Sequence, residues 1–221
     1  MRSPRVLWDG TLDPRPLLRG VSHQYALIAA VAAGATLVVL ASGTRATLAT
    51  GVYALSLAML FGTSAVYHRK WWRTPRSRNW MRRLDHSAIF LLIAGTYTPF
   101  SLLALEGLVA DIVLVCVWGG AVLGIGLYLV WIDAPRWLTA VAYLAVGWAG
   151  LASLPQMFEN AGLAASILVI VGGGLYTVGA LIYAWKRPDP VPSVFGYHEL
   201  FHALVVVAAA TQFVAVAIVV L

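Results

Sequence analysis

The sequence predicts an all-α integral membrane protein, a seven-transmembrane helix bundle with its N-terminus in the cytoplasm and its C-terminus outside. Three observations predict it: the apolar content, the number of long apolar runs and the distribution of positive charge. Of the 221 residues, 61% are hydrophobic and 11% are charged, whereas soluble domains are about 45–50% apolar and about 25% charged. A soluble chain of this size could not shield so much apolar surface, and disorder requires low hydrophobicity.

Seven apolar segments are each long enough, at about 20 residues per span, to cross a bilayer as helices. Turn and loop residues separate them, including prolines at positions 188, 190 and 192 after the sixth. The first is too long for the apolar core of a signal peptide, about 7–15 residues. We expect a cytoplasmic tail over residues 1–23 and one transmembrane domain over residues 24–221. The predicted spans are Gln24–Ala41, Ala46–His68, Asp85–Ala104, Leu108–Ile132, Arg136–Leu154, Leu163–Trp185 and Tyr197–Leu221.

The positive charges fix the expected orientation. With seven spans, all lysines and arginines except Arg45 fall on one side, which the positive-inside rule assigns to the cytoplasm of a multi-pass plasma-membrane protein. These charges lie between apolar runs rather than on a soluble face, so no nucleic-acid partner is expected. The basic segment Arg69–Arg83 is expected to contact anionic headgroups of membrane lipids, with attraction of an acidic lipid substrate as the alternative.

Four ionisable residues lie at the ends of predicted spans, where placing such groups in lipid is costly and therefore marks function. His198 and His202 are four residues apart and share a helix face. His68 ends the second span, with Ser64 one turn earlier, and Asp85 begins the third. Because successive spans alternate in direction, all of these groups are expected near the cytoplasmic surface at one depth.

Three histidines with an open coordination position are typical of a catalytic zinc site. The predicted zinc ligands are therefore His68, His198 and His202, and Asp85 would hold the metal-bound water or orient a ligand. An alternative follows from the H-E-x-x-H pattern at positions 198–202, in which Glu199 would be the general base. We favour Asp85 and keep Glu199 as its rival.

Several other residues receive simpler interpretations. His23 precedes the first span on its cytoplasmic side and is expected at the membrane interface, with a place at the rim of the site as the alternative. His86 points to a different face from Asp85 and is not expected to be a ligand. Cys116, the single cysteine, is expected to be a buried apolar side chain. Small-residue spacing in the fourth span, as at Gly120 and Gly124, favours close helix packing and leaves a homo-oligomer seam open.

At these residues the chain resembles the hemolysin III family, within the progestin and adipoQ receptor superfamily. Residues Ser64–His68 match its S-x3-H motif, Leu84–Phe100 its third-helix signature and Gly196–His202 its H-x3-H motif. The resemblance implies that the three histidines of the second and last spans bind zinc, that Asp85 contacts the zinc-bound water and that Ser64 is a nearby polar partner. The superfamily's first motif is reduced to His23, and an arginine stands where its asparagine would be.

Three functional hypotheses follow. The first is an intramembrane zinc hydrolase with Asp85 and Ser64 as catalytic residues, acting on a lipid that enters between the helices; relatives that resemble ceramidases suggest an amide-linked acyl lipid. The second is a membrane-state sensor or receptor-like protein in which zinc only joins the second and seventh spans. The third is a cytolysin, as the family name says, although the sequence has no β-hairpin pore element.

Overall fold

The computed structural model describes residues 15–221, and the predicted seven-span, all-α architecture is confirmed. Seven helical stretches of these residues are long and apolar enough to cross a membrane. The predicted tail is described only from Arg15 onward, and its residues 1–14 lie outside the described residues. The elements are α1 (Val21–Leu40), α2 (Thr44–Arg69), α3 (Pro75–Leu103), α4 (Gly107–Val130), α5 (Arg136–Gly147), a 3-10 turn (Leu151–Ser153), α6 (Leu154–Asn160), α7 (Gly162–Trp185) and α8 (Tyr197–Val220).

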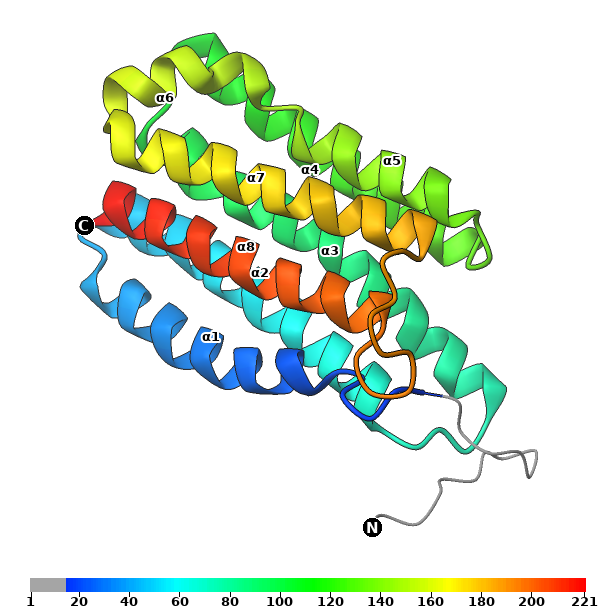
Figure 1. Cartoon of the computed structure of the whole chain (residues 1–221). Helices are drawn as coiled ribbons and strands as arrows, with labels where there is room; N and C mark the ends of the chain where they lie inside the picture. Colours follow the sequence, from blue (N-terminus) through cyan, green and yellow to red (C-terminus); the bar gives the residue numbers. More distant parts are fainter. Residues whose placement is uncertain (1–14) are drawn as a thin grey trace.

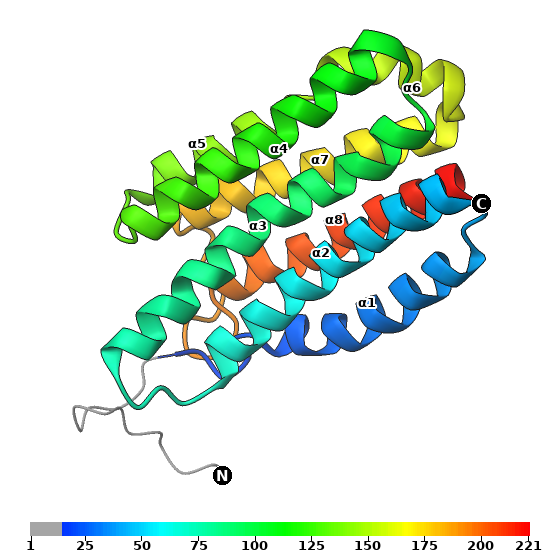
Figure 2. The same cartoon turned by 180° about the vertical axis from the view of Figure 1, so that it is seen from behind.

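The helices form an elongated bundle in which α2, α3 and α8 lie inside and the others cover them. In Figures 1 and 2, α1 lies on one side of the α2–α8 pair, and α4 and α5 form the opposite side. Helices α7 and α8 pack along their lengths, as do α2 and α3. The end of α2 and the start of α8, which carry the candidate ligands, meet at the end of the bundle where α1 begins (Figure 1).

The basic residues gather at this same end. Every lysine and arginine among residues 15–221 other than Arg45 lies there, in loops, in the first or last turn of a helix or, for Arg82 and Arg83, about two turns into α3. Arg2 and Arg5, which the prediction assigns to the same side, lie outside the described residues. The assignment of this end to the cytoplasm stays a prediction.

The third helix begins ten residues before the predicted start of the third span. Thr74 caps it by accepting a hydrogen bond from the backbone N–H of Ser77 at 3.2 Å, and Pro75 occupies the first turn. Asp85 therefore lies three turns inside α3 rather than at its beginning. The apolar pattern marks where a helix enters lipid, whereas the cap and the proline mark where the helix begins, and here the two differ.

The fifth span is interrupted. Helix α5 ends at Gly147, and a 3-10 turn and the short helix α6 complete the crossing. The Tyr97 hydroxyl donates a hydrogen bond to the Gly147 carbonyl at 2.6 Å, and Trp148 Nε1 donates to Thr177 Oγ1 at 3.1 Å. A break at membrane depth is tolerated where protein groups satisfy the freed backbone, and Tyr97 does this here.

Candidate metal centre

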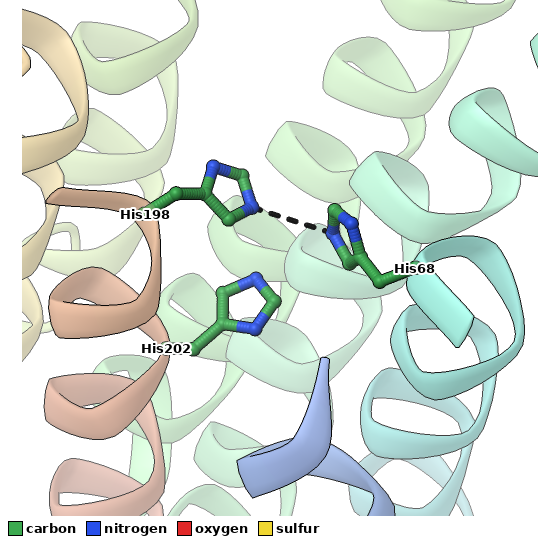
Figure 3. A group of neighbouring side chains, drawn as sticks. All are labelled: His68, His198 and His202. Atoms are coloured by element: carbon green, nitrogen blue, oxygen red, sulfur yellow. Dashed lines mark hydrogen bonds between the residues drawn. The ribbon is translucent and has the colours of Figure 1, made fainter. Parts of the chain in front are cut away.

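Three imidazole rings from two helices converge at the end of the bundle where α1 begins. His68 comes from the last turn of α2, and His198 and His202 come from the first two turns of α8. Figure 3 shows the three rings facing a common space, with the Nε2 atoms of His68 and His198 3.3 Å apart. One nitrogen from each ring lies within 4.8 Å of the other two, so the three residues are close enough to hold a metal ion.

Local sequence explains this convergence. The four-residue spacing of His198 and His202 puts both rings on one face of α8. Gly20, just before α1, has a φ of +75°, and a Cβ there would lie 2.6 Å from the Cβ of His68. Only glycine lets the chain pass this close to the end of α2.

The donor set fits a small divalent ion. Zinc–imidazole bonds are about 2.0–2.1 Å, so two tetrahedral ligand nitrogens lie about 3.4 Å apart. The 3.3 Å separation of the His68 and His198 nitrogens is close to that value. His68 and His202 are buried, and His198 is half-buried. Imidazole suits several transition metals, so these residues establish a candidate metal centre without fixing the metal.

Asp85 and Ser64 lie beside the three rings. The Asp85 Oδ2 atom is 3.7 Å from the His68 Nε2 atom, which is the same nitrogen that faces His198. The Ser64 hydroxyl hydrogen-bonds the Nδ1 atom of His23 at 2.8 Å, and it lines the same cavity as Asp85. The sequence-predicted carboxylate and hydroxyl are thus next to the predicted ligands, on α3 and α2.

His23 belongs to this group more closely than the sequence indicates. Its ring is 2% exposed and stacks on the ring of His202, with centroids 3.9 Å apart and planes at 6°. It also meets Phe61 edge-on. The sequence placed it at the correct depth but favoured an interfacial role; the stacking depends on how α1 is rotated against α8, which the sequence alone does not specify.

Glu199 and His86 have other partners. The Glu199 carboxylate pairs with the Arg19 guanidinium and accepts a hydrogen bond from the Gly196 backbone N–H at 2.9 Å, at the start of α8. His86 stacks on Tyr128 at 4.5 Å, and the Tyr143 hydroxyl donates to its backbone carbonyl at 3.1 Å. Glu199 therefore stabilises the start of the helix that carries two histidines. His86 lines the same cavity but is not one of the three histidines that are close enough together to hold a metal ion.

An apolar cavity of about 140 Å³ extends from the histidines into the bundle. Its walls come from α3, from the interrupted fifth span and from α7 and α8, and most of the lining atoms are hydrocarbon. His202, Asp85 and Ser64 line one end of it. The metal centre and the cavity therefore form one continuous site.

Fold and site together define a multi-pass membrane protein with a three-histidine cluster at one end of its bundle. The chain belongs to the haemolysin-III related family, whose sequence model matches residues 13–213. It is 31% identical over 200 residues to a protein named Hemolysin-3 from Bacillus cereus, covering 89% of this chain and 88% of the relative. It is also 31% identical over 162 residues to a Hemolysin-3 homolog from Bacillus subtilis (strain 168), covering 73% and 72%. The family expected from the three motifs is thereby confirmed, and a plasma-membrane location is consistent with these bacterial relatives.

Proposed function

We propose that this chain is a zinc-dependent hydrolase that cleaves an acyl linkage of a membrane lipid inside the bundle. The observation that supports the proposal best is the continuity between the three-histidine cluster and the apolar cavity. A hydrolytic centre at the polar end would act on the head of a lipid whose chain occupies the apolar end. The distribution of positive charge would place the histidine end of the site on the cytoplasmic side of the membrane.

The protein's own residues supply the remaining chemistry. His68, His198 and His202 would hold the zinc, which when bound acts as a Lewis acid toward a carbonyl and acidifies water. The Asp85 carboxylate, beside the ligand nitrogens, is placed to accept a proton from an attacking water. Ser64, which lines the cavity together with Asp85, would offer its hydroxyl to that carboxylate or to the substrate.

Asp85 is a better candidate for this base than Glu199. The Glu199 carboxylate is already engaged by Arg19 and by the N-terminal backbone of α8. Under this proposal the two histidines of the H-E-x-x-H pattern are zinc ligands, and its glutamate stabilises the start of α8 instead of acting as a general base.

The lining of the cavity supports a substrate with a long hydrocarbon chain. A chain lying among α3, α7 and α8 is shielded from water, while its carbonyl reaches the histidines. The proposal of an amide bond, as in ceramides, rests on the family resemblance rather than on a contact.

Acyl release by the purified full-length chain tests the proposal. We expect the zinc-loaded protein in lipid nanodiscs to release fatty acid from a ceramide. The His198→Ala variant and the chelated wild-type protein should each do so at least 100-fold more slowly. Cys116 lies at an exposed position on α4, so the expectation that it is buried is wrong. Cys116→Ala is the matched control and should keep the full rate. Equal rates for His198→Ala and the control would refute the hydrolase.

A second candidate is a sensor in which the metal only joins helices. The cluster favours this because its ligands come from two helices, α2 and α8, that are far apart in sequence. A structural metal would raise the unfolding temperature by an amount that grows with the logarithm of its concentration relative to the dissociation constant, without turnover of any lipid. Chelation that lowers the unfolding temperature of a protein with no hydrolytic rate would support the sensor.

A further inference from the structure

The deep part of the cavity contains two polar atoms that the rest of the protein does not satisfy. The Tyr176 hydroxyl on α7 and the Gln212 Oε1 atom on α8 are both inaccessible to solvent and have no hydrogen-bond partner among residues 15–221. Gln212 is 6% exposed, and both side chains line the same cavity as His202. Buried polar groups are nearly always paired in proteins, so these two are expected to meet a polar group that enters the cavity.

The two side chains lie at similar depth, well away from the histidines. Gln212 is ten residues beyond His202 on α8, which at 1.5 Å per residue is about 15 Å along the helix. It packs on Gly172 of α7, where a Cβ would lie 2.6 Å from the Gln212 Nε2 atom. Tyr176 is one turn from Gly172 on the side of the histidines. The distance of about 15 Å is half the thickness of a hydrocarbon core of about 30 Å. At that depth the surrounding lipid offers no water to a polar group.

The hydrogen-bonding chemistry of the pair specifies its ligand. The Gln212 Nε2 atom donates to the Val169 carbonyl at 3.0 Å, which fixes the amide and leaves Oε1 as an acceptor. The Tyr176 hydroxyl can donate and accept. A ketone or ester oxygen could satisfy only Tyr176, whereas a hydroxyl group donates to Gln212 and accepts from Tyr176.

We propose that Tyr176 and Gln212 form a hydroxyl-recognition subsite, so that the cavity prefers acyl chains with a hydroxyl group about 15 Å from the carbonyl held at the histidines. This inference rests on the proposed function for the position of the carbonyl. It narrows the substrate class from acyl lipids in general to lipids with a hydroxylated acyl chain.

Binding measurements without turnover test the subsite. The probes are octadecanoic acid and a series of octadecanoic acids whose single hydroxyl group is moved along the chain, bound to the full-length zinc-loaded protein in detergent. We expect the acid whose hydroxyl lies at the depth of Gln212 to bind about tenfold more tightly than the plain acid, as one or two buried hydrogen bonds would give. Tyr176→Phe and Gln212→Leu should each reduce this ratio toward one and leave plain-acid affinity within about twofold.

Ser101→Ala is the matched control, because Ser101 on α3 is also buried with an unpaired hydroxyl in the described structure but is outside the cavity lining. It should keep the tenfold preference. Equal affinity of the wild-type protein for every acid in the series would overturn the subsite, whatever the variants do, and would mean that Tyr176 and Gln212 hold only water. These experiments measure fatty-acid binding and do not depend on turnover. A protein that prefers the hydroxylated acid but does not cleave ceramide would therefore refute the hydrolase and leave the hydroxyl subsite standing.

Discussion

The α2–α3 pair and the interrupted α5–α6 span are built in opposite ways. In its most apolar stretch, α2 has 50% of its residues buried inside the protein and α3 has 56%. The corresponding value for the span over Arg136–Asn160 is 22%. Helices α2 and α3 are continuous and supply His68, Ser64 and Asp85. The α5–α6 span is broken and supplies cavity wall, with Tyr143 and Met157 among its lining residues.

This difference separates two requirements of the site. Ligands must be held within a few tenths of an ångström, which close packing of continuous helices provides. The lipid chain of the proposed function would need space instead, and the interrupted span leaves such space while the Tyr97 hydroxyl satisfies the freed Gly147 carbonyl.

Loss of a ligand should have the largest effect. His202→Ala leaves two imidazoles on separate helices, and we expect bound zinc to fall from about one per chain to a trace, because a two-ligand site loses most of its affinity. Elemental analysis of the purified protein measures this. The stabilisation by metal, about 4 kcal/mol at a thousandfold excess over the dissociation constant, should disappear with it.

His86→Phe is the control for that experiment. His86 is the buried histidine that stacks on Tyr128 rather than joining the cluster. It should keep one zinc per chain. A His202→Ala protein that still carries stoichiometric zinc would disprove the three-histidine site.

The next prediction compares the two carboxylates. Asp85→Asn should keep its zinc but hydrolyse lipid about 10²–10⁴-fold more slowly, because the group positioned to accept the proton is gone. Glu199→Gln should instead lower the unfolding temperature through loss of the Arg19 ion pair, with a rate within about tenfold of wild type. Rates and unfolding temperatures of both proteins decide between them; the reverse pattern would make Glu199 the base.

The sequence predicts the parts of this molecule that depend on composition and spacing. Seven apolar runs and the single exception of Arg45 were enough to predict the span number, and the spacing of His198 and His202 was enough to put both on one face. The sequence could not predict the stacking of His23, which depends on the rotation of α1 about its own axis. Nor could it predict the break after Gly147, because an apolar run continues through it.

A smaller effect is expected from the partner hydroxyl. Ser64→Ala removes the hydrogen bond to His23, and a hydroxyl that lines the cavity with Asp85, without touching a ligand nitrogen. Groups that orient ligands typically contribute 10–100-fold to metal affinity or activity, so we expect a loss of about that size in zinc competition and hydrolysis assays. Ser64→Thr, which keeps the hydroxyl, should recover part of it; an Ala variant with unchanged affinity and rate would remove Ser64 from the site.

The smallest effect compares the packing of the two regions directly. A Cβ at Gly95 of α3 would lie 2.7 Å from the Cβ of Ser56 on α2, whereas a Cβ at Gly147 of α5 would meet no atom within 4 Å. Gly95→Ala must therefore push α2 and α3 apart and should cost about 1–3 kcal/mol, while Gly147→Ala should change stability by less than about 0.5 kcal/mol. Thermal unfolding of both variants in the same detergent measures the difference. Because the α2–α3 pair also aligns His68 with Asp85, Gly95→Ala should weaken zinc binding as well, and a variant that loses stability but keeps full zinc affinity would show that the ligand geometry does not depend on this close packing.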